Sequence, residues 1–266
     1  MTMWYRGLPA RRRRFVAGLA GLTAAVACAV TLVIVGGAGD GSPAGYPSQS
    51  RPGPVLLVPG YGGSTAGLTV LARRIRATGR AALVIRLPGN GTGSLTRYAG
   101  VLNQAVNRAL RDGAPSVDVV GYSAGGVTAL LWAREDDGDR KARRVVTLGS
   151  PFHGTTLATA AQGLAPSACP AACVQLIPGS RLLAGLAAGV PARLPWLSLW
   201  TTDDQTVTPP ASARLTGAID VSVQSVCRHQ RLSHSQLPTS SVVATMVIRA
   251  IGSGPVVRPT PADCGT

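Results

Sequence analysis

The sequence predicts an α/β fold with a mostly parallel central sheet and helices on both faces. Short apolar runs that suit buried strands alternate with longer helical patterns along most of the chain. The strand runs are Val55–Val58, Ala82–Ile85, Val117–Val120, Val145–Leu148, Leu197–Thr201 and Ile219–Val223. The helical runs are Leu68–Ala77, Leu95–Arg111, Gly126–Arg134 and Val242–Ile251. Because the strand runs are mostly apolar, we expect helices to cover both faces of the sheet.

The N-terminal region has the pattern of a targeting segment. Arg11–Arg14 precede a long uncharged run, Phe15–Gly39, which suits an export signal and is also long enough to cross a bilayer. We therefore expect residues 1–38 to be an export signal or an N-terminal membrane anchor, and residues 39–54 to be a Gly/Pro/Ser linker. Residues 55–266 are expected to form one globular domain. The protein would be secreted, or held at the extracellular face of the membrane by residues 15–38.

The chain is strongly basic, with a formal net charge of +15. Clusters such as Arg73, Arg74 and Arg76, and the basic run 140–144, have no interleaved aromatic residues and no nucleic-acid-binding motif around them. We therefore interpret these arginines as solvated helix faces and expect no nucleic-acid partner. Weak attraction to anionic lipid headgroups stays open.

Four cysteines lie beyond the targeting segment, an even number that predicts two disulfides in an oxidising compartment. Of the three possible connectivities, we favour a local clip between Cys169 and Cys173 and a tether of the C-terminal tail between Cys227 and Cys264. No second close cysteine pair or histidine spacing supports a metal site in these four residues.

The most informative motif is Gly121-Tyr-Ser-Ala-Gly125, which lies between a strand run and a helical run. A Gly-x-Ser-x-Gly sequence in this context predicts a tight turn that exposes the hydroxyl of Ser123 above the sheet. The N-terminus of the following helix would favour the negative charge that develops when a carbonyl is attacked. Ser123 is therefore the candidate nucleophile.

A serine nucleophile needs a histidine base and a carboxylate that orients it. His234 lies in a loop before the final helical run, where such a base is expected after the nucleophile, and His229 is the alternative. For the acid, Asp204 stands three residues before Val207 at the end of a strand run, and Asp203 stays open as the alternative.

Two backbone N–H groups would form the oxyanion hole. Ala124 follows the nucleophile, and Tyr61 follows Gly60 in the glycine-rich loop after the first strand run. Chemistry of this kind needs no cofactor. No metal is expected, because the sequence has no acidic cluster suited to calcium.

The chain resembles the small secreted bacterial lipases and esterases of the α/β-hydrolase fold over about residues 54–251. The motifs that carry the resemblance are Val58-Pro-Gly-Tyr-Gly-Gly-Ser64, Leu87-Pro-Gly-Asn-Gly-Thr-Gly93, Gly121-Tyr-Ser-Ala-Gly-Gly126, Leu148-Gly-Ser-Pro-Phe-His-Gly-Thr155, the Asp204 loop and His234. The chain departs from the family at Pro59, where a histidine usually precedes the oxyanion glycine. His153 belongs to a motif typical of these lipases and is expected to be structural, beside the site.

The resemblance implies a secreted serine hydrolase that cleaves acyl esters, lipids above all, as a monomer able to meet a lipid interface. An acyltransferase and a non-catalytic lipid-binding module of the envelope are the alternatives. Residues 155–195 interrupt the strand and helix alternation and predict a small cap, or an ordinary crossover with a helix over Arg181–Ala188. We expect leucines such as Leu182 and Leu186 to line a groove for the acyl chain.

Overall fold

The computed structural model describes residues 45–265. The expected export segment or anchor, residues 1–38, and the start of the expected linker lie outside this range. The compact unit begins at Tyr46, so residues 46–54 belong to it together with the sheet. Within the described part of the chain, no helix is both long and apolar enough to cross a membrane.

The sheet has six strands, all parallel, in the order β2-β1-β3-β4-β5-β6. Their bounds are β1 Val55–Val58, β2 Ala82–Val84, β3 Val117–Tyr122, β4 Ala142–Leu148, β5 Trp196–Trp200 and β6 Ile219–Ser222. Each strand overlaps one of the apolar runs in the sequence. The predicted fold class, a mostly parallel sheet of the α/β-hydrolase type, is confirmed.

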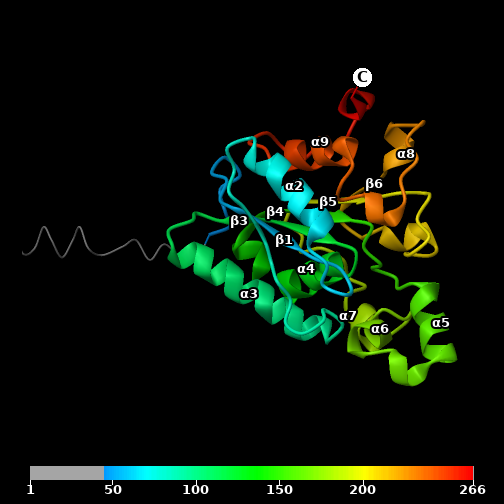
Figure 1. Ribbon diagram of the computed structural model, residues 1–266. Coiled ribbons are helices and arrows are strands. Elements are labelled where there is room, and N and C mark those ends of the chain that lie inside the picture. Colours follow the sequence, from blue (N-terminus) through cyan, green and yellow to red (C-terminus); the bar gives the residue numbers. More distant parts are fainter. Residues whose placement is uncertain (1–44, 266) are drawn as a thin grey trace, which may run out of the picture. The chain divides into compact units, whose positions relative to one another are not determined.

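Helices cover both faces of this sheet, as Figure 1 shows. The helices α3 (Leu95–Arg111) and α4 (Ala124–Glu135) pack on one face, and α2 (Ala66–Arg76) and α9 (Ser241–Ala250) pack on the other. Side chains along β1 alternate between these layers. Leu56 and Val58 join the core on the α3 and α4 side, whereas Val55 and Leu57 join the core on the α2 and α9 side.

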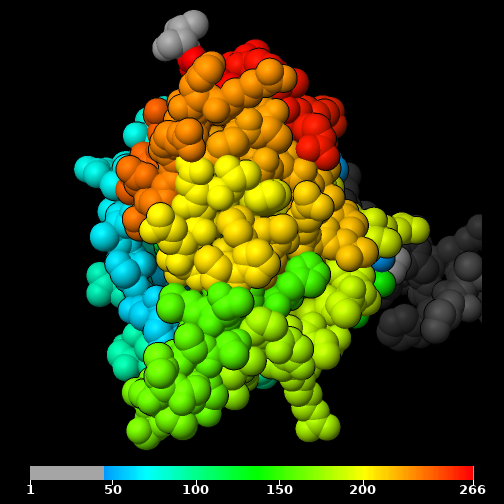
Figure 2. Space-filling model, turned by 90° about the vertical axis from the view of Figure 1, so that its right-hand side faces the viewer, coloured from blue at the N-terminus to red at the C-terminus, as the bar shows by residue number. Residues whose placement is uncertain are grey.

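An insertion between β4 and β5 carries three helices: α5 (Thr156–Leu164), α6 (Ala171–Gln175) and α7 (Arg181–Gly185). We call residues 155–195 the insertion. In Figure 2 its green and yellow-green surface lies at one end of the folded unit, below the yellow surface around β5 and the loop after it. The helix α7 is shorter than the predicted Arg181–Ala188, and a further short helix, α8 (Val223–Val226), follows β6.

Both predicted disulfides are confirmed. Cys169 and Cys173 bridge the start of α6 within the insertion, with a Cα–Cα distance of 5.2 Å. Cys227 and Cys264 lie 5.5 Å apart at their Cα atoms and join the end of α8 to the C-terminal tail. Arg249 of α9 also holds this tail, because its Nη1 donates to both carboxylate oxygens of Asp263 at 2.7 and 2.6 Å.

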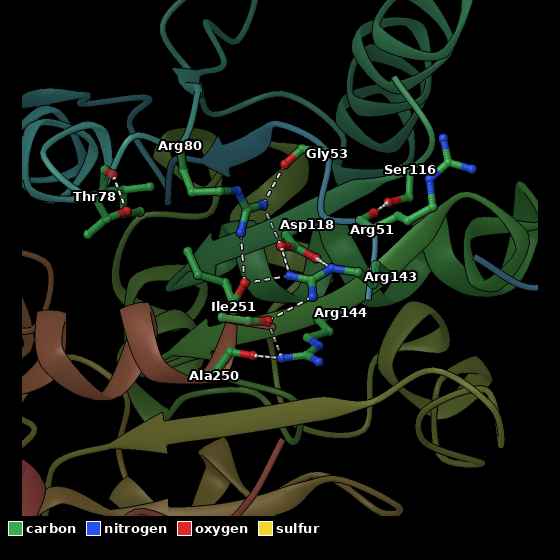
Figure 3. A network of polar contacts seen from close by, with 12 residues as sticks. Arg51, Gly53, Thr78, Arg80, Ser116, Asp118, Arg143, Arg144, Ala250 and Ile251 are labelled. Atoms are coloured by element: carbon green, nitrogen blue, oxygen red, sulfur yellow. Dashed lines mark hydrogen bonds and ion pairs between the residues drawn. The ribbon is translucent and has the colours of Figure 1, made fainter. Parts of the chain in front are cut away.

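A buried carboxylate lies at the amino end of β3 (Figure 3). The side chain of Asp118 has no solvent exposure and accepts from two guanidinium groups. Arg80 donates from Nη2 to Oδ2 at 2.7 Å, and Arg143 donates from Nε to Oδ1 at 3.0 Å and from Nη2 to Oδ2. Each carboxylate oxygen is therefore paired with a cation, which offsets the cost of removing the charge from water.

The same arginines bind the C-terminal end of α9. Arg80 donates to the carbonyl of Ile251 at 2.7 Å, and Arg143 donates to that of Gly252 at 2.8 Å. Arg144 donates to the carbonyl of Ala250 at 2.7 Å, as Figure 3 also shows. The last carbonyls of a helix lack intrahelical donors and carry partial negative charge, so cations stabilise this end.

The interpretation of the basic run 140–144 as a solvated face is wrong for Arg143 and Arg144. These residues are 0% and 1% exposed and belong to β4, which begins three residues earlier than predicted. The start of the strand was not predicted because these two residues are charged. The sequence does not show that Asp118 and the end of α9 lie opposite their guanidinium groups.

We predict that Asp118→Asn lowers the free energy of unfolding by about 3 to 5 kcal/mol, because it leaves buried Arg143 without its counter-charge. Urea denaturation followed by circular dichroism measures the change. Asp203→Asn is the matched control. Asp203 is partly exposed and faces the exposed Arg231 at 3.6 Å, so its replacement should cost less than about 1 kcal/mol. Equal losses in the two variants would contradict the role of the buried network.

Candidate active site

The candidate nucleophile lies in the turn between β3 and α4. Ser123 has φ +53° and ψ −128°, a conformation that a residue with a side chain adopts only when its surroundings impose it. Glycines provide the space for this turn. A Cβ on Gly121 would lie 2.6 Å from the Cα of Gly126, and a Cβ on Gly125 would lie 2.2 Å from the carbonyl oxygen of Val58. The strand-to-helix turn predicted from the motif is present.

His234 and Asp204 form a buried pair at the carboxyl edge of the sheet. Nδ1 of His234 lies 2.7 Å from Oδ2 of Asp204, and their side chains are only 8% and 2% exposed. Oδ1 of Asp204 accepts from the backbone N–H groups of Thr206 and Val207 at 2.9 and 2.8 Å. These bonds hold the carboxylate in place, so that a proton on Nδ1 of His234 is directed toward Asp204 and Nε2 is left as the basic nitrogen.

The alternative residues lie elsewhere. Asp203 faces outward, where Oδ1 lies 3.6 Å from the guanidinium of exposed Arg231. His229 is exposed and lines a surface hollow beside the Cys227–Cys264 disulfide. His153 is exposed, with Nδ1 3.2 Å from the carbonyl oxygen of Ser212. Of the alternatives that the sequence left open, the structure brings together Asp204 and His234.

Backbone contacts place this pair close to the nucleophile. The N–H of Ser123 donates to the carbonyl of Leu148 at the end of β4, at 2.8 Å. The next residue, Gly149, has φ +56°, and a Cβ there would lie 3.1 Å from Nδ1 of His234. The nucleophile and the histidine therefore adjoin consecutive residues, Leu148 and Gly149, where β4 ends.

Sequence reasoning missed Tyr122, which immediately precedes the nucleophile. Its ring centroid lies 5.1 Å from that of His234, and its hydroxyl donates to the carbonyl of His234 at 3.3 Å. Burial, together with the negative charge of Asp204, raises the pKa of Tyr122 to about 12, so that the hydroxyl stays protonated as a donor at neutral pH. An aromatic residue in the variable position of the motif was the available signal.

The predicted oxyanion donors flank the nucleophile. The backbone of Gly60 lies against Ser123, since a Cβ on Gly60 would lie 2.8 Å from Cβ of Ser123. The N–H of Gly63 donates to the carbonyl of Gly60 at 3.0 Å. This bond closes a turn in which Tyr61 is the second residue. The N–H of Tyr61 meets no acceptor within residues 45–265. Ala124 is the first residue of α4, so its N–H has no intrahelical acceptor.

An apolar cavity of about 220 Å³ opens beside Ser123. The insertion provides much of its wall, because Leu157, Ala158 and Ala161 share one face of α5 and Leu176 follows α6. The full lining is Tyr61, Ser123, Pro151, Thr155, Leu157, Ala158, Ala161, Cys173, Leu176, Thr206 and Val207. None of these side chains carries a charge at neutral pH, so the cavity suits a hydrocarbon chain.

The expectation that Leu182 and Leu186 line an acyl groove next to the site is wrong. Leu186 is 5% exposed and packs in the core on the α3 and α4 side, and Leu182 packs against the same cluster. Both residues border a separate hollow that also includes Arg134 and Glu135. The sequence showed that the insertion is apolar, but the orientation of α5 and α6 decides which side chains reach Ser123.

The chain matches one known protein family. The profile of the alpha/beta hydrolase family matches residues 55–258, which contain all the residues of the candidate site. The chain belongs to this family. No curated protein sequence matches this hydrolase.

The hydrolase is similar in structure to Aspergillus fumigatus lipase B, with a TM-score of 0.67 at 17% identity over 81% of this chain and 57% of the lipase chain. It therefore spans little more than half of that lipase. It is also similar to the mature form of Bacillus licheniformis lipase BlEst2, with a TM-score of 0.63 at 18% identity over 77% of this chain and 94% of that one. At these identities the similarity shows the shared fold.

We predict that Asp204→Asn reduces kcat by about 10³- to 10⁴-fold, as in other triads, because His234 loses the carboxylate that orients it. Asp203→Asn changes the neighbouring carboxylate without touching His234 and serves as the control. Steady-state hydrolysis of p-nitrophenyl esters measures both variants, with circular dichroism to check folding. A severe effect of Asp203→Asn with a mild effect of Asp204→Asn would reverse the assignment of the acid.

Proposed function

We propose that this hydrolase is a serine esterase that cleaves carboxylic esters, with acyl chains on lipids as the substrate class. The observation that carries the proposal is the hydrogen bond between His234 and Asp204 beside the strained turn of Ser123, at the mouth of an uncharged cavity. A nucleophile, an oriented base and an apolar pocket are the parts that ester hydrolysis needs.

The proposed reaction begins when Nε2 of His234 takes the proton of the Ser123 hydroxyl and Oγ attacks the ester carbonyl. The carbonyl oxygen becomes an oxyanion, which the N–H groups of Tyr61 and Ala124 stabilise. As the tetrahedral intermediate collapses, the C–O bond to the alcohol breaks and the histidine returns its proton to the leaving oxygen. Water, activated by the same histidine, then hydrolyses the acyl-enzyme and regenerates Ser123.

The size and lining of the cavity support an acyl chain of several carbons. Its space of about 220 Å³ is walled by uncharged side chains, most of them apolar. A medium-length acyl group is therefore the proposed fit. Short acyl groups would leave apolar surface of the cavity unfilled, and each methylene that fills it contributes about 0.8 kcal/mol.

The surface of the insertion supports a substrate presented in a lipid phase. Residues 154–180 contain no charged side chain, although the chain as a whole is strongly basic. Leu157 and Leu164 of α5 are 54% and 87% exposed, and Leu157 also lines the cavity. Exposed apolar surface beside a cavity mouth is suited to contact with a lipid aggregate.

We also propose that the protein acts outside the cytoplasm, secreted or held by residues 15–38. The two disulfides support this location, because such bonds persist in oxidising compartments.

We predict that kcat/KM rises from acetyl to hexanoyl or octanoyl p-nitrophenyl esters and that Ala161→Trp moves the optimum to shorter chains. Ala161 lines the cavity, so an indole ring there would occupy the space of the distal acyl carbons. Acetyl ester hydrolysis should stay within about twofold, because the triad lies on other loops.

Ala160→Trp is the matched control, since Ala160 is the exposed neighbour on the same helix and does not line the cavity. This variant should keep the wild-type chain-length profile. If acetyl esters are already the best substrates of the wild type, the lipid part of the proposal fails. If Ser123→Ala retains full activity, or a fluorophosphonate does not label Ser123, the serine mechanism fails. Ester products that exceed the hydrolysis product when a dilute alcohol acceptor is added would indicate an acyltransferase, in which the alcohol outcompetes water.

A further inference from the structure

The glycine-rich segment Leu87–Gly93 has no part in the chemistry proposed above, yet it contacts the oxyanion turn directly. We call it the glycine loop. It connects β2 to α3, and the carbonyl of its fifth residue, Gly91, accepts from the N–H of Gly62 at 3.1 Å. Gly62 directly follows Tyr61, the proposed oxyanion donor. The loop therefore holds the turn one residue from the group that would bind the substrate.

The contact is backbone against backbone. A Cβ on Gly91 would lie 2.3 Å from the nitrogen and 2.5 Å from the Cα of Gly63, closer than real Cβ atoms approach other heavy atoms. It would also lie 2.7 Å from the carbonyl carbon of Gly62. A side chain at position 91 must therefore displace the oxyanion turn or the glycine loop itself.

The other side of the glycine loop is anchored firmly. Thr92 accepts at its carbonyl from the N–H of Ala172 in the disulfide-clipped helix α6, at 3.1 Å. The N–H of Gly93 donates to the hydroxyl of Tyr98 in α3 at 2.6 Å. Within the loop, Oδ1 of Asn90 accepts from the N–H and the hydroxyl of Thr92 at 3.2 and 2.6 Å. The loop is therefore held on its far side, so a side chain at position 91 would press against the turn.

We propose that Gly91 is a positioning residue, through which the glycine loop holds the N–H of Tyr61 in line with the carbonyl oxygen of the reacting ester. The inference rests on the proposed function, because it assigns a catalytic role to a backbone contact that supports the proposed oxyanion hole. A misplacement of about 1 Å at such a donor can cost about 10²-fold in rate.

The test compares Gly91→Ala with Gly89→Ala. Both glycines belong to the same loop and have positive φ, +72° and +66°, so alanine imposes the same type of backbone strain at each. A Cβ on Gly89, however, would have no atom within 4 Å. For p-nitrophenyl acetate, Gly91→Ala should lower kcat by about 10- to 10²-fold and change KM by less than about twofold, whereas Gly89→Ala should stay within about twofold of the wild type.

A trifluoromethyl ketone provides a second readout that simple destabilisation would not change. Oγ of Ser123 adds to its carbonyl carbon, the serine proton passes to His234, and the hemiketal oxygen takes the negative charge in the oxyanion hole. Its inhibition constant should weaken in Gly91→Ala by the same factor as kcat/KM, with no change in Gly89→Ala.

Asn90→Ala keeps the inference testable if Gly91→Ala fails to fold. Asn90 is exposed, and its removal frees Thr92 without adding atoms. We expect a several-fold lower kcat at unchanged KM. Equal kinetics of the two glycine variants, or wild-type kcat in both Gly91→Ala and Asn90→Ala, would overturn the inference alone. A wild-type protein that hydrolyses no ester would overturn the proposed function and this inference together.

Discussion

The backbones of β1, β3 and α4 meet beside Ser123 with no room for a side chain between them. Gly125 lies against the carbonyl of Val58, and Gly121 lies against Gly126, at separations that only a hydrogen atom on the Cα permits. This close approach forces the serine into its positive φ. It also brings Gly60, two residues after the end of β1, against the side chain of Ser123. One steric constraint therefore places the nucleophile and the oxyanion turn together.

The two ends of the sheet have different roles, one structural and the other in the candidate site. At the amino end, Asp118 and three arginines form a buried network that binds the last carbonyls of α9. At the carboxyl end, the loop of His234 leads directly into the first turn of the same helix. α9 thus connects a rigid ionic anchor to the loop that carries the proposed base. The buried ionic network thus lies at the opposite end of the sheet from the strained turn at Ser123.

The insertion separates substrate recognition from the chemistry. Its helices α5 and α6 form the wall of the cavity, whereas the candidate triad lies on β3, on the loop after β5 and on the loop before α9. Changes in the insertion can therefore alter the preferred acyl chain and leave the reacting groups in place. The Cys169–Cys173 clip stiffens the part of this wall that also contacts the glycine loop.

Much of this architecture follows from local sequence. Continuous apolar runs predict strands, because a sheet covered by helices buries both of its faces, and runs with a period near 3.6 predict helices that bury one face. The elbow at Ser123 is local as well, since it requires small residues on both sides of the serine. Both disulfide pairs that the sequence favoured among three possible connectivities are present.

The sequence alone thus determined the strand and helix runs, the elbow and the candidate residues, all of which are read from patterns within a few positions along the chain. Only the tertiary structure decided that Asp204 and not Asp203 faces His234, that Arg143 is buried against Asp118, and that Ala161 rather than Leu182 reaches the cavity. The physical reason is the same in each case. A side chain's partner is set by which distant element packs opposite it, and neighbouring residues with the same chemistry differ only in the direction in which the fold points them.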